Sequence, residues 1–315
     1  MNYPITIRLS STALGKAACI KNLYLSIVEG YRPKLMPCRI VYGIAIHKFI
    51  HVAFQTDDIP KALDAGLKAF RLPKDDPPRN QQHLADERHF QITCLNLWTM
   101  HIQDEKDFKI ISIDGKPLTE ITFCIKSFYK DDIIDVSLEG TLDRLGQVRS
   151  GVFAVRDWKS TSSWDNNGYF EQFELSRQIR LYTLICKIEA ERNPESTLGK
   201  IGASHMGCFI DAIFIKPNAN DNVVKSSSMY SFKKEELEEF KNELLYLCRG
   251  ISKRFRFEKH LAREGIINGS CEGKWGKCNF WNCCQAPANV EQVLLNRDFN
   301  KVGWNPSDYN NLGEI

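Results

Sequence analysis

The hydrophobic period of this chain changes along its length, and that change constrains the fold more than any other feature. Residues 108–159 contain short alternating or β-branched runs, which predict β-strands. These runs are FKIISID, ITFCIKSFY, IIDVSLEGTLDRL and SGVFAVRDWKS, and they are bounded by the turn signals DGKP, KDD and GQVRSG. The spacing becomes helical in YFEQFELSRQIRLYTLICKIEAER, and the strand HMGCFIDAIFIKP and the amphipathic helix KKEELEEFKNELLYLCRGISKRF follow. The pattern predicts an α/β (α+β) protein with an antiparallel meander at its centre.

The first third of the chain predicts mostly helix. Ser10 or Ser11 is suited to cap a helix through TALGKAACIKNLYLSIVEG, and Gly30 is its stop signal. A second helix is predicted in YGIAIHKFIHVAFQ, and two more are predicted at 58–72 and 81–104. The breaker cluster PKDDPPRN separates the last two. We therefore expect a helical part before the sheet, with no firm domain boundary.

Composition predicts a globular protein. Its 315 residues are 43% hydrophobic, which is enough for a substantial core. The formal charge of +3 arises from 42 basic and 39 acidic residues, so a nucleic-acid surface would have to be a local patch. The sequence has no apolar stretch of membrane-spanning length, and its N-terminus has polar residues where a signal peptide needs an apolar run. We expect a cytoplasmic protein without membrane contact.

Two acids and a lysine lie at the ends of consecutive predicted strands. Asp143 ends one strand, and Asp157 lies at the end of the next, two residues before Lys159. Residues i and i+2 of a strand point to the same face, so Asp157 and Lys159 should project side by side. If the two strands pair, both carboxylates meet at one sheet edge, where they could bind a divalent cation. The alternative is an ordinary Asp–Lys ion pair at the end of a strand.

Three further residues could belong to the same site. His47 falls in the apolar face of a predicted helix, four residues after Gly43, although a single histidine in such a face is also typical of a core. Gln178 and Tyr182 are four residues apart on the helix that follows the second strand, so they face the same way. Ordinary helix-surface chemistry is the alternative for that pair.

Taken in order, these motifs resemble a known nuclease family. They are Gly43-x-x-x-His47, Gly140-Thr-Leu-Asp143-Arg144, Asp157-Trp-Lys159-Ser-Thr161 and Gln178-x-x-x-Tyr182. This series is similar to the RecB-type branch of the PD-(D/E)XK nucleases, which includes the CRISPR adaptation nuclease with an iron–sulfur cluster and many phage exonucleases. The resemblance covers residues 10–284 and implies a restriction-endonuclease-like central mixed sheet flanked by helices.

The resemblance also implies a role for each residue of the motifs. The implied ligands of Mg²⁺ or Mn²⁺ are His47, Asp143, Asp157 and the backbone carbonyl of Trp158. Lys159 would be the catalytic lysine, with Gln178 and Tyr182 orienting the lysine or the DNA backbone. A histidine among the ligands favours Mn²⁺, because Mg²⁺ prefers oxygen and water. The family often has Glu where this chain has Asp157, which shortens the side chain without changing its chemistry.

The cysteines form two classes. Of the eleven, most lie singly in apolar segments, as reduced core residues do. Cys271, Cys278, Cys283 and Cys284 instead crowd into the segment CEGKWGKCNFWNCC, a density that indicates metal binding in an intracellular chain.

The resemblance implies a [4Fe–4S] cluster held by one cysteine near the N-terminus and three near the C-terminus. Those residues would be Cys19, Cys271, Cys278 and Cys284. The spacing between Cys271 and Cys278 is longer than the family usually shows. The alternatives are a structural Zn²⁺ on Cys271, Cys278, Cys283 and Cys284, or reduced cysteines without a metal.

Candidate DNA contacts are the arginines near the predicted site and the basic run at 248–263. The arginines are Arg144, Arg149, Arg156, Arg177 and Arg180. Basic side chains can follow phosphates, although a solvated helix face explains the run equally well. We divide the chain into a helical part at 1–106 with Cys19 and His47, a nuclease core at 107–260 and a cysteine-rich module and tail at 261–315.

The sequence therefore predicts a metal-dependent exodeoxyribonuclease that acts on single-stranded or end-exposed DNA. Metal-activated water would hydrolyse the phosphodiester while Lys159 stabilises the charge on phosphate. The alternatives are a catalytically silent DNA-binding or assembly module and a ribonuclease. The family habit implies protein partners of recombination, replication or CRISPR type, and a phage or mobile-element origin.

Overall fold

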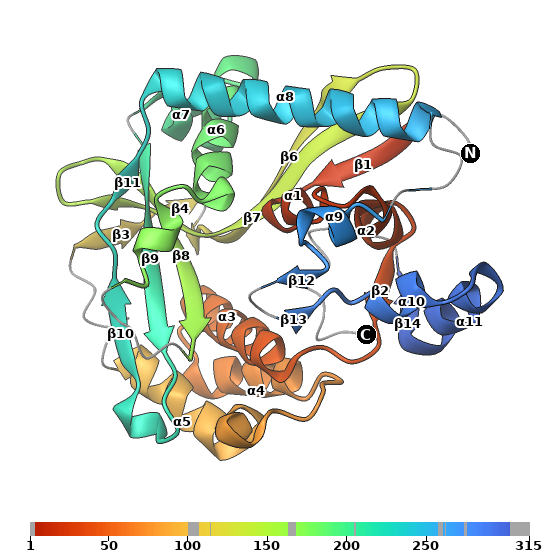
Figure 1. Cartoon of the computed structure of the whole chain (residues 1–315). Coiled ribbons are helices and arrows are strands. Elements are labelled where there is room, and N and C mark those ends of the chain that lie inside the picture. Colours follow the sequence, from red (N-terminus) through yellow and green to blue (C-terminus); the bar gives the residue numbers. More distant parts are fainter. Residues whose placement is uncertain are drawn as a thin grey trace. The chain divides into compact units, whose positions relative to one another are not determined.

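The structure is a computed structural model that describes residues 4–99, 107–113, 115–162, 168–204, 206–257, 261, 263–273 and 276–302 (Figure 1). The α-helices are α1 (Ser11–Lys16), α2 (Ile20–Leu23), α3 (Cys38–Thr56), α4 (Ile59–Phe70), α5 (Glu87–Leu97), α6 (Arg177–Arg192), α7 (Thr197–Ala203), α8 (Lys234–Phe257), α9 (Gly265–Asn268), α10 (Trp281–Gln285) and α11 (Ala288–Asp298). A π-helical segment is at Tyr24–Val28, and short 3₁₀ helices are at Arg79–Ala85, Glu171–Phe173 and Ala219–Asp221.

The longer strands are β1 (Ile5–Leu9), β6 (Thr119–Lys130), β7 (Ile134–Val148), β8 (Phe153–Thr161), β9 (Met206–Phe214) and β10 (Val223–Ser226). The shorter strands are β2 (Tyr31–Pro33), β3 (Phe108–Ile110), β4 (Ser112–Ile113), β5 (Lys116–Pro117), β11 (Tyr230–Ser231), β12 (Glu272–Gly273), β13 (Gly276–Lys277) and β14 (Phe299–Lys301). β7 pairs with β8 antiparallel, and β8 pairs with β9 parallel. The predicted α/β architecture with a mixed sheet and flanking helices is confirmed.

The chain forms two compact units, and β6 and β7 contribute residues to both. Unit 1 consists of residues 1–34, 123–140 and 238–308. In it, β1 runs parallel to the first part of β7, and β14 pairs antiparallel with β2. A small core joins the start of the chain to its late helices, and in it the Tyr31 ring meets the Phe299 ring edge to face, with centroids 6.4 Å apart. The division predicted from the sequence at 106 and 260 stays a prediction.

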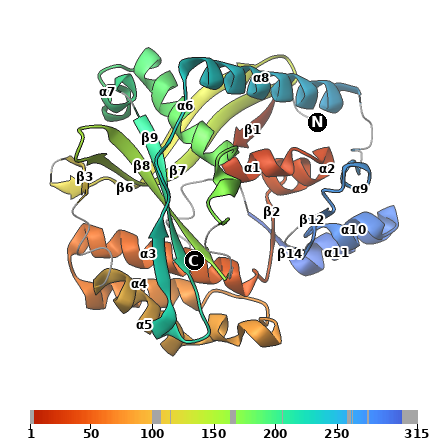
Figure 2. The same cartoon turned by 60° about the vertical axis from the view of Figure 1, so that its left-hand side comes forward.

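Unit 2 consists of residues 35–122, 141–237 and 309–315 and contains β8 at its centre. The middle of β8, residues 154–158, is buried without alternation, as expected of a strand with helices on both faces. Trp158 points into a hydrophobic core built largely by α3, α4 and α5. Its neighbours on the strand point the opposite way, and Asp157 contacts Tyr182 of α6. Figures 1 and 2 both show α6 and α7 apart from the group α3–α5.

The predicted first helix is not continuous. Ser10 caps α1 as predicted, since its Oγ accepts a hydrogen bond from the Ala13 N–H at 3.2 Å, and Gly30 has the left-handed φ of +74° expected at a stop. Between them, Cys19 is extended, so α1 ends before it and α2 begins after it. A long-range hydrogen bond supports this break, because the Ile20 N–H donates to the Glu264 side chain at 3.0 Å. Among the described helices, none is long and apolar enough to cross a membrane.

The packing of α7 on α6 gives a stability prediction. A Cβ added at Gly202 would lie 1.8 Å from the backbone oxygen of Cys186, so the two helices would have to move apart. We expect Gly202→Ala to reduce the free energy of unfolding by about 1–3 kcal/mol, the usual cost of overpacking. Gly250 of α8 is a matched helical control, since nothing lies within 4 Å of its added Cβ. Gly250→Ala should stabilise by about 0.5–1 kcal/mol. Urea denaturation measures both, and equal effects would contradict the predicted clash.

Candidate functional site

β7 and β8 bring the predicted acids together next to the Arg144–Arg156 pair, the last pair of their antiparallel register. Asp143 precedes Arg144 and Asp157 follows Arg156, so both acids lie beside this pair. Each acid lies inside its strand, so the prediction that they end their strands is wrong. Asp143 Oδ2 accepts a hydrogen bond from the Trp158 N–H at 2.7 Å, which attaches the first acid to the strand that carries the second. Asp157 and Lys159 form an ion pair on the same face of β8, as predicted.

Helix α3 supplies the histidine. A Cβ at Gly43 would lie 2.9 Å from Ser160 Oγ, so this glycine lets the helix approach β8 closely. One turn later, His47 lies beside the same part of β8, with Nε2 3.2 Å from the carbonyl oxygen of Trp158. Its Nδ1 is 3.5 Å from Asp143 Oδ2. Three of the four predicted metal ligands are therefore in contact with one another.

A residue that the sequence interpretation missed completes this group. Glu120, at the start of β6, has Oε1 3.4 Å from His47 Nδ1. His47, Glu120 and Asp143 each offer a ligand atom, and these atoms lie within 4.8 Å of one another. Such a cluster of imidazole and carboxylates could bind a divalent cation.

Asp157 is held by a second set of contacts. Its Oδ1 accepts hydrogen bonds from Gln178 Nε2 at 3.0 Å and from the Tyr182 hydroxyl at 3.1 Å. Gln178 and Tyr182 also hydrogen bond to each other across one turn of α6. The structure therefore brings together the predicted motif residues, with Asp157 between α6 and Lys159. The catalytic roles of these residues stay predictions.

Burial and mutual charge shift the pKa values at this site. Burial raises the pKa of Asp157 to about 6 against the opposing effect of Lys159. Burial also raises the pKa of Asp143, and the Glu120 carboxylate adds to that shift. Burial alone would lower the pKa of His47, but Asp143 and Glu120 outweigh it and raise the pKa to about 9. The shifts of the two aspartates mainly reflect their burial, whereas the His47 shift reflects the carboxylates around it.

The charges of these side chains suit a divalent cation. Three carboxylates, from Glu120, Asp143 and Asp157, face the single ammonium of Lys159. Once a bound metal has displaced the proton of His47, these side chains carry two more negative than positive charges, which a divalent cation balances. Oxygen ligands with one imidazole fit either ion, and the imidazole favours Mn²⁺. The donor set therefore fits a divalent cation.

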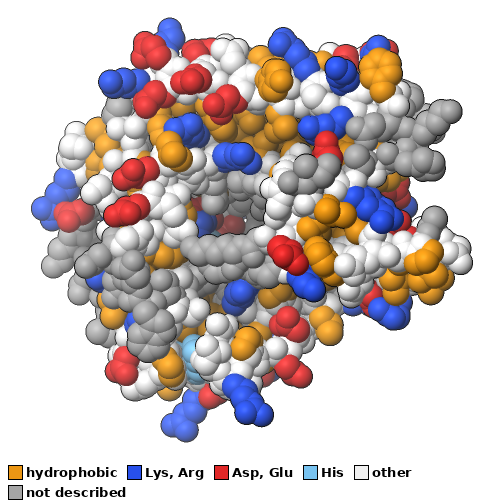
Figure 3. All heavy atoms as spheres, in the orientation of Figure 1, with side chains coloured by type: hydrophobic (Ala, Val, Ile, Leu, Met, Phe, Trp, Pro, Cys, Tyr) orange, Lys and Arg blue, Asp and Glu red, His pale blue; other side chains and the backbone are white. Residues whose placement is uncertain are grey.

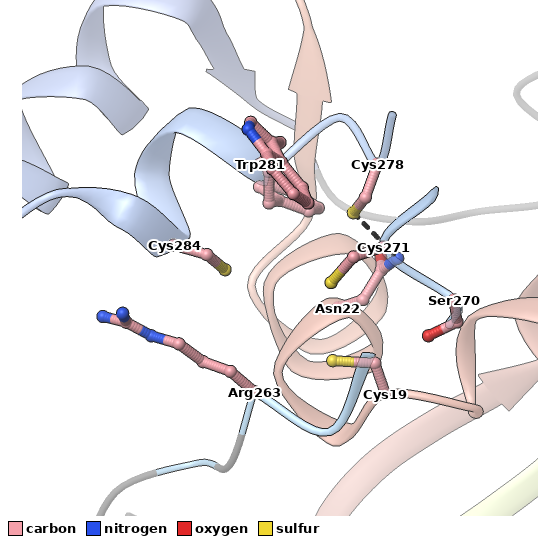
Figure 4. Close-up of a pocket in the computed structure, with 9 residues that line it drawn as sticks. Cys19, Asn22, Arg263, Ser270, Cys271, Cys278, Trp281 and Cys284 are labelled. Atoms are coloured by element: carbon pink, nitrogen blue, oxygen red, sulfur yellow. Dashed lines mark hydrogen bonds between the residues drawn. The ribbon is translucent and has the colours of Figure 1, made fainter. Parts of the chain in front are cut away.

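A second candidate metal site lies in unit 1. Cys19, Cys271, Cys278 and Cys284 line one pocket, together with Asn22 and Arg263 (Figure 4). Figure 4 shows the sulfur atoms of Cys19, Cys271 and Cys284 directed into the same space, while Cys278 Sγ accepts a hydrogen bond from Asn22 Nδ2 at 3.5 Å. Cysteines more than 250 residues apart in the sequence thus converge as predicted.

Polar contacts around the pocket hold the two ends of unit 1 together. Lys21 forms an ion pair with Glu291 at 2.7 Å, and Asn268 donates to the Ala18 carbonyl at 2.5 Å. Cys283 has another role, since it is buried in the small core with Leu25 and Phe280 and does not belong to the described pocket lining. Burial raises the pKa of the Cys284 thiol to about 11, so a metal would have to displace its proton.

Two of the predicted DNA-contacting arginines are inside the protein. Arg144 is completely buried and Arg156 is 8% exposed, and both pair with Asp211, at 2.6 Å and 3.5 Å. Their alternation with Asp143 and Asp157 along the strands places them on the opposite face of the sheet from the acids. The prediction of surface contacts for Arg144 and Arg156 is therefore wrong. Arg149 and Arg177 are exposed and stay candidates.

The visible surface in Figure 3 carries Lys and Arg side chains interspersed with Asp and Glu. Over α8, acidic side chains gather at the N-terminal half and basic side chains at the C-terminal half, which contains Arg249, Lys253 and Arg256. Asp132 pairs with Arg256, which reduces the local positive charge. The basic run at 248–257 is thus partly neutralised.

Comparison with known proteins gives limited similarity. No family model matches the chain, and no curated protein matches it. The crystal structure of a "Putative exonuclease" from Eubacterium rectale aligns with a TM-score of 0.47 and 10% identity, over 91% of this chain and 92% of that one. The crystal structure of SSO0001 aligns with a TM-score of 0.27 and 8% identity, over 81% and 93%. Both scores are below 0.5, so neither structure contributes to the assignment of function.

Proposed function

We propose that this protein is a metal-dependent nuclease that hydrolyses DNA from single-stranded or exposed ends. The observation that carries the proposal is the Asp157–Lys159 ion pair beside the cluster of His47, Glu120 and Asp143. A structural ion pair needs no further acids around it, and like charges gathered in one place cost stability unless a cation joins them. The order of the motifs, which resembles the RecB-type nucleases, is in accord with this proposal.

In the proposed reaction a divalent cation bound at the cluster would supply Lewis-acid stabilisation of the phosphate and would make a water molecule more acidic. Side chains and one backbone carbonyl of the protein supply the other contributions. Lys159 places an ammonium where a nonbridging phosphate oxygen gains negative charge in the transition state. Gln178 and Tyr182 hold Asp157 by hydrogen bonds, so its carboxylate keeps one orientation during turnover. Trp158 contributes its backbone carbonyl, since its side chain is in the core.

We also propose that the cysteine pocket binds a metal cofactor, a [4Fe–4S] cluster held by Cys19, Cys271, Cys278 and Cys284. Four thiolates are the usual ligands of such a cluster. The convergence of these residues in one pocket supports this set over the four tail cysteines, because Cys283 packs in the core instead. The cofactor would fasten the first helices of unit 1 to its last ones.

A cleavage assay tests the proposed function. The purified chain is incubated with Mn²⁺ and with DNA labelled at the 5′ or the 3′ end, as single and as double strands, and with RNA of the same sequence. We expect Mn²⁺-dependent release of short products from single-stranded DNA or from exposed ends, abolished by EDTA. DNA that is bound but never cut would favour a silent binding module, and faster cleavage of RNA would favour a ribonuclease.

A further inference from the structure

We propose that Glu120 is a positioning residue that orients His47, so that Nε2 of the imidazole is the atom presented to the cation. This role rests on the proposed metal-dependent function. In this arrangement Nε2 of His47 and the Trp158 carbonyl oxygen bind the ion, and Glu120 accepts a hydrogen bond from Nδ1 on the other side of the ring.

The two ring nitrogens of His47 face different partners. Nε2 is 3.2 Å from the Trp158 carbonyl oxygen. Neighbouring ligand atoms around an octahedral Mg²⁺ are about 3 Å apart, because each bond is about 2.0–2.1 Å long. Nε2 and this oxygen therefore have the spacing of two ligands of one ion.

Nδ1 of His47 faces carboxylates instead. Glu120 Oε1 lies 3.4 Å from it. Asp143 Oδ2 is 3.5 Å from Nδ1 and accepts the Trp158 N–H at 2.7 Å, whereas the shorter Glu120 contact has the geometry of a hydrogen bond, so Glu120 is the better partner of Nδ1. A metal-bound histidine commonly donates its other ring N–H to a carboxylate, and this bond fixes both the tautomer and the ring orientation. Glu120 occupies that position.

The backbone at Glu120 is unusual. Its φ is +50°, in the left-handed region that residues other than glycine rarely adopt. Such a conformation persists only where surrounding contacts enforce it, and it is found most often at functional sites. Here the conformation places the side chain at the start of β6 against His47.

Helix α3 supplies the enforcing contacts. Thr119 Oγ1 is 2.9 Å from His51 Nδ1 and 3.0 Å from Gln55 Nε2. Gln55 Nε2 also donates to the Pro117 carbonyl at 2.9 Å. His47, His51 and Gln55 follow one another at four-residue intervals, so they share one helix face. The face that carries the metal-binding ring therefore also fixes the strand that carries Glu120.

Metal titration of the full chain tests this role. We expect Glu120→Ala to weaken Mn²⁺ binding about 10- to 100-fold, the usual effect of removing such a partner. Glu120→Gln should retain most of the affinity, because its amide oxygen still accepts a hydrogen bond from Nδ1. Equal losses in the two variants would show that the charge of Glu120 itself binds the ion and would overturn the proposal.

Two further measurements distinguish a change in the orientation of the His47 ring from a general loss of structure. In ¹⁵N-histidine NMR of the Mg²⁺-loaded protein, Nε2 of His47 should be coordinated and Nδ1 protonated, and coordination through Nδ1 would overturn the proposal. Thr119→Val, which removes the hydroxyl held by His51 and Gln55, should weaken Mn²⁺ binding in the same direction as Glu120→Ala. Unchanged binding in that variant would refute the part assigned to α3.

A control variant and the behaviour of the wild type separate the role of Glu120 from the proposed nuclease function. Asp57 is an exposed acid with φ of +51° at the end of α3, so Asp57→Ala controls for loss of an acid in this backbone conformation and should bind Mn²⁺ as the wild type does. A wild-type protein that binds Mn²⁺ but cuts no nucleic acid would refute the nuclease function. The Mn²⁺ affinities of the Glu120 variants would still test the positioning role. A wild-type protein that binds no Mn²⁺ would refute both.

Discussion

Replacing Lys159 with methionine is expected to slow Mn²⁺-dependent DNA cleavage by at least about 10²-fold, because a preorganised cationic donor to a developing oxyanion typically contributes this much or more. Methionine keeps an unbranched side chain that is one atom shorter, and it removes the charge. Mn²⁺ binding should be retained, since the ligands are unchanged and a competing positive charge is lost. Initial rates of product release under saturating Mn²⁺ measure the first effect, and calorimetric titration measures the second.

Lys187 provides the matched control for Lys159. It is a partly buried lysine on α6 whose ammonium donates to the Ser204 carbonyl at 3.2 Å, outside the candidate site. Lys187→Met should cleave DNA at the wild-type rate. Circular dichroism checks that both variants are folded, because removing Lys159 leaves the buried Asp157 without its ion partner. A folded Lys159→Met protein that retains more than a tenth of the wild-type rate would exclude this lysine from the chemistry.

Replacing Cys19 with alanine is expected to remove the bound metal from unit 1 and to destabilise that unit by more than about 4 kcal/mol, since loss of a structural metal is among the largest single-residue effects. Cys19 is one of four cysteines in the pocket and the one that comes from the opposite end of the chain. Iron, zinc and sulfide contents of protein purified without oxygen identify the metal, and urea denaturation measures the stability.

Cys283→Ala is the matched comparison. Both residues are buried, at 7% exposure for Cys19 and 1% for Cys283, but Cys283 packs in the hydrophobic core. We expect Cys283→Ala to keep the full metal content at a modest cost in packing. Loss of metal from Cys283→Ala but not from Cys19→Ala would instead support zinc on the four tail cysteines. Wild-type protein with neither iron nor zinc would show that the thiols are reduced and unligated.

The sequence predicted the parts of the fold that depend on local periodicity. The strand runs around Asp143 and Asp157 and the helix that contains His47 are where the alternating and helical spacings placed them. The break in the first helix at Cys19 was missed, because it depends on a hydrogen bond from Ile20 to Glu264, which no local pattern reveals.

The candidate site was predicted incompletely for a similar reason. The motif residues could be found because each lies at a fixed spacing within one element. Glu120 lies outside those motifs, and its position depends on long-range contacts of Thr119 with α3. One local signal existed, the four-residue spacing of His47, His51 and Gln55, which marks a polar face on an otherwise apolar helix. The burial of Arg144 and Arg156 could have been expected, since both alternate with acids that face the other way.

The cysteine pocket has a consequence for biogenesis. One wall comes from Cys19 and Asn22 and the others from lining residues between Arg263 and Cys284, so the pocket cannot form on a ribosome-bound chain until Cys284 has been synthesised. Cys19 leaves the exit tunnel long before its partners are translated and must stay reduced and unpaired meanwhile. A metal that needs all four thiols can therefore bind only after both segments of unit 1 have been synthesised and have folded together.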